Sequence, residues 1–119
     1  MPDPEPIIYQ AVLKFRKYGI AEPELYFYDG KCLYFADMLL DLYPEGELYT
    51  SSNHAVVKID NYLWDVTGCI HPAFYKEYFP DKERMATDWF HQDDKEVIEL
   101  CQKVGHELRE EYFNNSLKQ

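Results

Sequence analysis

The sequence predicts a single α+β domain, and three observations support this prediction. Apolar residues recur at helical spacing near both ends of the chain. Between them lie two β-prone runs, HAVVKI at residues 54–59 and YLWDV at residues 62–66. The length of 119 residues, 46% of them hydrophobic, suits one core. We therefore expect residues 1–119 to form one domain with helices on either side of a hairpin.

The first helix is expected to begin at Pro6, because proline is favoured at the first position of a helix. Gly19 interrupts its pattern, and residues 20–31, which contain Pro23 and Gly30, predict an irregular connection. The apolar face of this helix is formed by Ile8, Ala11, Val12, Phe15 and Tyr18.

A second helix is predicted over residues 32–43, CLYFADMLLDLY. Only Asp37 and Asp41, one turn apart, mark a polar stripe on it. A helix that is apolar nearly all round is typical of the middle of a domain. Pro44 and Gly46 end the pattern.

A short strand at residues 47–50 and a hairpin at residues 54–66 follow. Asp60 and Asn61 separate the two β-prone runs, and both residue types tolerate the positive φ of a two-residue turn. Such a turn pairs Ile59 with Tyr62.

This register decides whether two polar side chains meet. With the two-residue turn, His54 and Asp65 become diagonal neighbours on one face of the hairpin, with Cβ atoms roughly 5 to 8 Å apart. A three-residue loop would send Asp65 to the opposite face. The interaction of His54 with Asp65 is therefore a conditional prediction.

Beyond Gly68 the pattern becomes helical again. A short helix is expected at residues 72–79, an aromatic segment at Trp89 and Phe90, and a long final helix from about Asp93. The apolar stripe of this last helix consists of Val97, Leu100, Cys101, Val104, Leu108 and Tyr112.

The charge balance restricts the class of partner. Twelve basic and 22 acidic residues give a formal charge of −10, which repels nucleic acid and anionic membrane surfaces. A protein or peptide of basic character is the better partner. No apolar run reaches the length of a bilayer span, and the acidic N-terminus is unlike a secretory signal, so a cytoplasmic location is expected.

The three cysteines, at 32, 69 and 101, form no CxxC pair. An odd number without such a pair indicates neither a disulfide framework nor a zinc ribbon. Cys69 and His71 form a CxH pair, but no second pair of ligands accompanies it, so we expect no metal or other cofactor. Cys101 lies on the apolar stripe and is expected in the core.

Cys32 is the candidate nucleophile, because it stands at a helix start, where unpaired N–H groups favour a thiolate. Gly30 allows a sharp turn and a close substrate approach. His54 is the candidate base and Asp65 the group that orients it. Taken singly, each has a structural alternative: a buried small side chain, a strand histidine and a turn carboxylate.

These residues also carry a resemblance to a known family. The segment GKCLYFADMLLDLY resembles the nucleophile segment of the transglutaminase-like branch of papain-like cysteine enzymes, and HAVVKI and WDVTG resemble its histidine and aspartate motifs. The resemblance covers about residues 30–68. It implies a papain-like α+β core, with the nucleophile helix packed on a small antiparallel sheet and a catalytic triad of Cys32, His54 and Asp65.

Two functions follow as expectations. The first is thiol-dependent acyl chemistry on an amide or thioester, as in a protease, deamidase or acyltransferase. In that case Tyr26 or Tyr28 is expected to help stabilise the oxyanion, and Gly30 and Asn53 to contact substrate. The alternative is a protein-binding or regulatory module that keeps the fold without turnover, using an edge rich in tyrosine.

Overall fold

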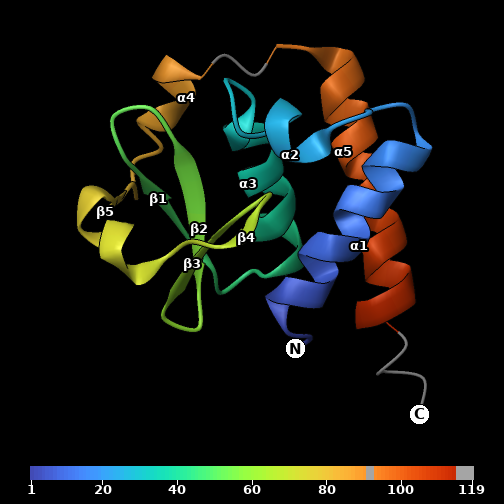
Figure 1. The fold of residues 1–119 in the computed structure, drawn as a ribbon, viewed down its shortest axis with the longest axis horizontal. Coiled ribbons are helices and arrows are strands. Elements are labelled where there is room, and N and C mark those ends of the chain that lie inside the picture. Colours follow the sequence, from blue (N-terminus) through green and yellow to red (C-terminus); the bar gives the residue numbers. More distant parts are fainter. Residues whose placement is uncertain (91–92, 115–119) are drawn as a thin grey trace.

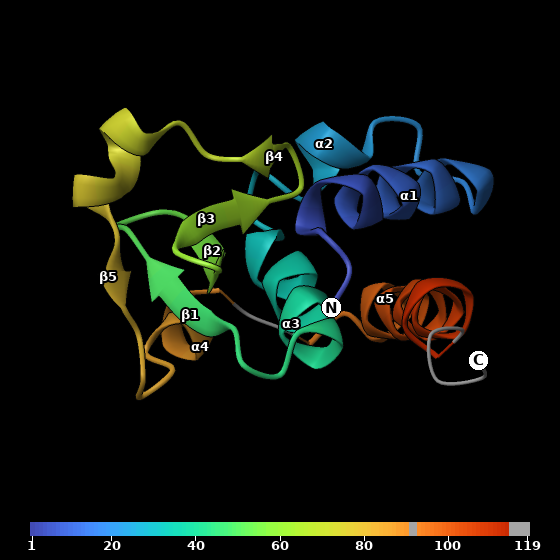
Figure 2. The same ribbon diagram turned by 90° about the horizontal axis from the view of Figure 1, so that it is seen from below.

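The computed structural model of the chain describes residues 1–90 and 93–114, which form three layers. A small sheet forms one outer layer, and helix α3 (Cys32–Leu42) packs against it. Helices α1 (Pro4–Lys17) and α5 (Lys95–Leu108) lie side by side on the other face of α3 (Figures 1 and 2). The α+β class with helices at both ends of the chain is therefore confirmed.

Within the described ranges, the sheet has five antiparallel strands in the order β4-β3-β2-β1-β5. The predicted strand and hairpin are present, and Ile59 pairs with Tyr62. Asp60 and Asn61 have φ of 52° and 69°, which confirms the two-residue turn. The strands are β1 (Glu47–Thr50), β2 (Ala55–Ile59), β3 (Tyr62–Asp65), β4 (Gly68–Cys69) and β5 (Phe79–Pro80).

The two edge strands correct the expectation that only helices follow Gly68. Strand β4 pairs with β3, and β5 pairs with β1. Each contains two residues, which is too short to produce an alternating pattern in sequence. Their positions depend on the neighbouring strands, which the local sequence does not encode.

Helix α1 begins two residues earlier than predicted, at Pro4. The reason is a cap: the carboxylate of Asp3 accepts a hydrogen bond from the Glu5 N–H, and Pro4 then occupies the first helical position. The connection that follows contains one short helix, α2 (Pro23–Tyr26).

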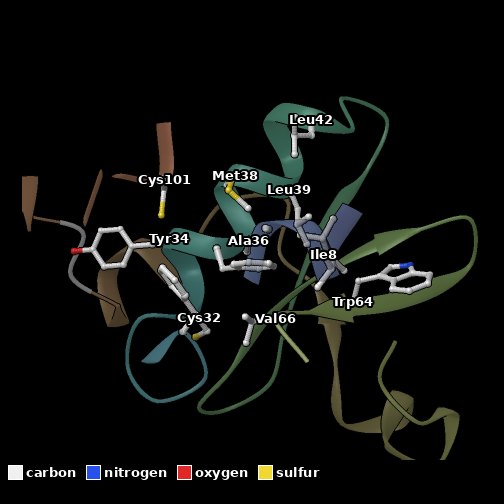
Figure 3. Close-up of a cluster of buried hydrophobic side chains, with 14 of the residues drawn as sticks. Ile8, Cys32, Tyr34, Ala36, Met38, Leu39, Leu42, Trp64, Val66 and Cys101 are labelled. Atoms are coloured by element: carbon white, nitrogen blue, oxygen red, sulfur yellow. The ribbon is translucent and has the colours of Figure 1, made fainter. Parts of the chain in front are cut away.

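Helix α3 is buried on most sides, as its composition predicts. The buried ring of Phe35 packs near Phe15 of α1 and Phe27, with centroids 6.3 and 5.6 Å away. Figure 3 shows Met38, Leu39 and Leu42 of this helix in a cluster that also contains Ile8 and Trp64. Of its two acidic residues, Asp37 pairs with Arg84 and Asp41 with Arg109.

In addition to α5, the described residues after β4 include three helical segments: η1 (Pro72–Glu77), α4 (Ala86–Trp89) and η2 (Arg109–Phe113). Asp94 caps α5 by accepting from the N–H groups of Glu96 and Val97. Of the predicted apolar stripe, Tyr112 is 37% exposed. The chain widens into a π-helix at η2, and Phe113 packs on Tyr43 instead.

Within residues 1–90 and 93–114, no helix combines the length and apolar character needed to cross a bilayer.

Candidate active site

Three elements bring the candidate residues together at one end of the sheet. Cys32 is the first residue of α3, His54 directly precedes β2, and Asp65 is the last residue of β3. Because β2 and β3 form a tight hairpin, the start of one strand lies beside the end of the other. The packing of α3 on β2 then brings the helix start to the same place.

His54 and Asp65 form a buried pair. Nε2 of His54 lies 2.8 Å from Oδ2 of Asp65, and the two residues are 4% and 6% exposed. The other carboxylate oxygen, Oδ1, accepts hydrogen bonds from the backbone N–H and the hydroxyl of Thr67. The carboxylate is therefore fixed from both sides and can hold the imidazole in one orientation.

The thiol of Cys32 is attached to the same strand. Its Sγ accepts a hydrogen bond of 3.3 Å from the N–H of Ala55, the residue after His54. The second ring nitrogen of His54, Nδ1, is buried and has no hydrogen-bond partner among the residues that the structure describes. Cys32 is nevertheless close enough to His54 to stabilise its protonated form.

The electrostatics of this cluster favour a protonated histidine. Burial acts to lower the pKa of His54, but the hydrogen bond to Asp65 and the interaction with Cys32 outweigh it and raise the pKa from 6.5 to about 9. An imidazolium ring beside a sulfur atom stabilises negative charge on that sulfur. The arrangement can thus support a thiolate and imidazolium pair.

The start of α3 supplies hydrogen-bond donors. The first N–H groups of an α-helix have no partner within the helix. Lys31, which precedes α3, makes no capping hydrogen bond with its side chain. These N–H groups lie beside the sulfur and are suitable donors to an oxyanion formed by attack of Cys32 on a carbonyl.

A cleft of about 560 Å³ opens next to the pair. The Tyr28 ring lies against His54 with centroids 4.5 Å apart, and Tyr78 approaches edge-on at 6.3 Å. Burial, with smaller effects of Tyr28 and Asp65, raises the pKa of Tyr78 to about 12. The cleft is lined by Tyr28, Asp29, Gly30, Ser51, Asn53, His54, Asp65, Thr67, Cys69, Ile70, His71, Phe74, Glu77 and Tyr78.

Among the additional residues predicted for the site, Gly30, Asn53 and Tyr28 line this cleft. Tyr26 does not: its ring packs edge-on against Phe27 at 5.0 Å, and the Lys31 ammonium lies 5.4 Å from the ring centroid. Helix α2 ends at Tyr26, and the chain then turns, so Tyr26 and Tyr28 face different surroundings. Of the two tyrosines considered for the oxyanion, Tyr28 lines the cleft and Tyr26 does not.

Tyr78 and Thr67 also contact the candidate residues, and neither contact was predicted from the sequence. Tyr78 lies between η1 and β5, and no spacing in the sequence relates it to His54. Thr67 was part of the aspartate motif, but its hydrogen bonds to Asp65 were not expected. An Asp-x-Thr turn, in which the threonine N–H and hydroxyl both return to the carboxylate, was the available signal.

Cys32 itself is 3% exposed and is not among the residues that line the cleft. Its sulfur lies beside His54 but is covered in this structure. Any ligand in the cleft would meet His54 and Gly30 first, so access to the sulfur requires a side chain to move.

The other two cysteines have separate surroundings. Cys69 is exposed, 3.5 Å from the hydroxyl of Tyr75, while Nδ1 of His71 accepts the N–H of Ala73. Cys101 is buried, as predicted, and burial followed by Asp37 raises the pKa of its thiol to about 12. In the described part of the chain, no group of three or more His, Cys, Asp or Glu side chains is arranged to hold a metal ion.

Comparison with known proteins gives a family match. The model of a family described as Phage YunG-like protein matches residues 15–104, a segment that contains all three candidate residues. No curated protein and no solved structure matches the chain.

Proposed function

The chain belongs to the Phage YunG-like protein family, and we propose that it is a cysteine enzyme that performs acyl chemistry on an amide or thioester. Cys32 is the nucleophile, His54 the general base and acid, and Asp65 the residue that positions His54. The observation that carries the proposal is the use of the two histidine nitrogens. Nε2 is hydrogen-bonded to the buried carboxylate of Asp65. Nδ1 has no hydrogen-bond partner among the described residues, and the ring interacts with the thiol of Cys32 at the start of α3.

The fold supports a related proposal: α3 and the sheet form a minimal papain-like core of the transglutaminase-like type. In support, the nucleophile opens the helix that packs on the sheet, the base directly precedes β2, and its carboxylate ends the adjacent antiparallel strand β3. Their order along the chain is Cys32, His54 and Asp65. The residues on which the sequence resemblance rests are thus the same residues that converge in space.

In the proposed reaction, Cys32 gives its proton to His54, and Sγ attacks the carbonyl carbon. A sulfur to carbon bond forms, and the carbonyl electron pair moves to oxygen, which the N–H groups at the start of α3 stabilise. When the carbonyl re-forms, the amine or thiol leaving group departs with the proton from His54. Water or an amine then attacks the thioester, returns a proton to His54 and releases Cys32.

The test is formation of an acyl-enzyme with p-nitrophenyl acetate. We expect an acetyl group on Cys32, located by peptide mapping, and none there in Cys32→Ala. His54→Ala should slow acetylation of Cys32 by about 100-fold or more, because general-base assistance is typically that large. Cys69→Ser is the matched control and should retain the acetylation of Cys32.

A non-catalytic role is the second candidate, and one observation favours it: Cys32 is nearly inaccessible. On that alternative the chain uses its exposed aromatic side chains, among them Phe74 and Phe79, to contact another protein. Acetylation of Cys69 as fast as that of Cys32, or a rate at Cys32 that does not depend on His54, would support this alternative and contradict the enzyme.

A further inference from the structure

We infer that the cleft selects peptide substrates with a lysine or arginine side chain next to the carbonyl that is attacked. This inference rests on the proposed function, because it names the substrate class of the same site. It depends on the charges of the cleft wall, on its aromatic surface and on the buried histidine that lines the cleft.

The cleft wall is acidic. Asp29 and Glu77 both line it, in addition to the Asp65 carboxylate that is engaged by His54 and Thr67. No hydrogen bond or ion pair joins the side-chain carboxylate of Asp29 or of Glu77 to another described residue. Two carboxylates without a protein cation are therefore available to a ligand.

Among the described residues, the wall contains no lysine or arginine that would compete for these carboxylates, and the protonated His54 is already paired with Asp65. Lys31 is adjacent to Gly30 in sequence, but its ammonium group lies over the Tyr26 ring, away from the cleft. A ligand cation would therefore supply the missing positive charge.

A buried polar group marks where the reacting end of a ligand belongs. His54 is 96% buried and lines the cleft, and its Nδ1 has no hydrogen-bond partner among the described residues. A buried polar atom without a hydrogen-bond partner requires an explanation, and in the proposed reaction this nitrogen exchanges a proton with Cys32. The carbonyl to be attacked would lie near this nitrogen, with the cation at the carboxylates.

The aromatic surface suits a long cationic side chain. Tyr28, Phe74 and Tyr78 line the same cleft, and Phe74 is 54% exposed. Such rings contact the aliphatic part of lysine or arginine and attract the charged end. The formal charge of −10 on the whole chain adds long-range attraction for a basic peptide.

The experiment compares two acetyl-alanyl chloromethyl ketones, one ending in lysine and one in norleucine, which has an uncharged side chain of similar shape. In each reaction Cys32 Sγ bonds to the chloromethyl carbon, chloride leaves, and the thiol proton passes to solvent. Labelling of Cys32 and Cys69 is followed by peptide mapping. We expect the lysine probe to label Cys32 about fivefold faster, the size expected of one or two exposed ion pairs.

The double variant Asp29→Asn/Glu77→Gln should lose this preference, and higher salt should reduce it in the wild type. The matched control is Glu99→Gln, which removes an exposed carboxylate on α5, outside the cleft, and should keep the preference. Both altered cleft carboxylates are exposed, and circular dichroism will show whether each variant keeps the native fold.

Two failures are distinguishable. If both probes label Cys32 selectively but at equal rates, or if the double variant keeps the preference, the inferred substrate class is wrong and the proposed function stands. If neither probe labels Cys32 faster than Cys69, the proposed function fails and the substrate inference fails with it.

Discussion

The protonation of His54 links the site to the stability of the fold. Burial lowers its pKa, while Asp65 and Cys32 raise it, and the result is a pKa of about 9 against 6.5 in the unfolded chain. The folded protein therefore holds this proton more tightly than the unfolded chain does. The stabilisation is complete below pH 6.5 and is lost as the pH rises through about 9.

His54→Gln should consequently destabilise the protein more at pH 6 than at pH 9.5. The upper bound for the pH-dependent difference is about 3 kcal/mol, which corresponds to the rise in pKa. Urea unfolding of both proteins at the two pH values measures it. His106→Gln, at an exposed position on α5, is the control and should change stability by no more than about 0.5 kcal/mol. A loss of unfolding free energy in His54→Gln that is larger at pH 9.5 than at pH 6 would contradict the raised pKa of His54.

Tyr28 is the side chain best placed to control access to Cys32. Its ring lies against His54 although the residue is 50% exposed, whereas Cys32 is 3% exposed. Tyr28→Ala should therefore speed alkylation of Cys32 by iodoacetamide severalfold. Tyr62→Ala removes a tyrosine of similar exposure at the hairpin turn and should leave the rate unchanged. Equal rates in wild type and Tyr28→Ala would show that another residue covers the sulfur.

At the scale of elements, the hairpin turn fixes the register on which the site depends. Asn61 has φ of 69°, in the left-handed region that a β-branched residue adopts only at a cost. Asn61→Val should destabilise the protein by about 1–2 kcal/mol, whereas Asn61→Gly should not, because glycine adopts this conformation freely. Urea unfolding measures both changes, and equal stabilities for the two variants would contradict a role for the turn conformation.

The sequence predicted the elements whose signals are local. The hairpin register followed from Asp60 and Asn61, and α3 followed from its nearly continuous apolar surface. The edge strands β4 and β5 escaped prediction because each contains two residues and depends on a neighbouring strand. The rotation of Tyr112 out of the core escaped it because a π-helical turn interrupts the spacing of α5.

The candidate site also combines contacts that follow from local sequence with contacts that depend on the packing of distant segments. The proximity of His54 and Asp65 could be predicted because it requires only the hairpin register. The position of Tyr78 could not, because it depends on how η1 and β5 return to the sheet. The choice between Tyr26 and Tyr28 could not be made either, because it depends on the turn after α2 that separates them. The burial of the Cys32 sulfur likewise depends on packing across elements.

At the scale of the whole molecule, α3 joins the sheet to the outer helices, so its core contacts stabilise every layer. Phe35 is 1% exposed and packs against rings from α1 and from the segment after α2. Phe35→Ala should lower the free energy of unfolding by about 3–5 kcal/mol. Phe79→Ala, at a residue 67% exposed, should change it by no more than about 0.5 kcal/mol. Similar losses in the two variants would contradict this three-layer arrangement.

The layered packing also explains why the site lies where it does. The start of α3 meets the start of β2, where the N–H of Ala55 donates a hydrogen bond to the sulfur of Cys32. A change in how α3 sits on the sheet would separate the thiol from the histidine without altering either residue. The chemistry proposed for this chain therefore depends on the whole core.

The most direct test of the central claim is the pH dependence of alkylation at each cysteine, with Cys69 and Cys101 as internal references. Peptide mapping after brief iodoacetamide treatment from pH 5 to pH 10 gives three rates in one sample. If His54 activates Cys32, its alkylation should persist at pH 6, where an ordinary thiol with a pKa of about 8.5 reacts slowly, and His54→Ala should abolish this persistence. The proposed active site would be contradicted if the alkylation rate of Cys32 decreased in parallel with that of exposed Cys69 as the pH is lowered, and if His54→Ala left the rate of Cys32 unchanged.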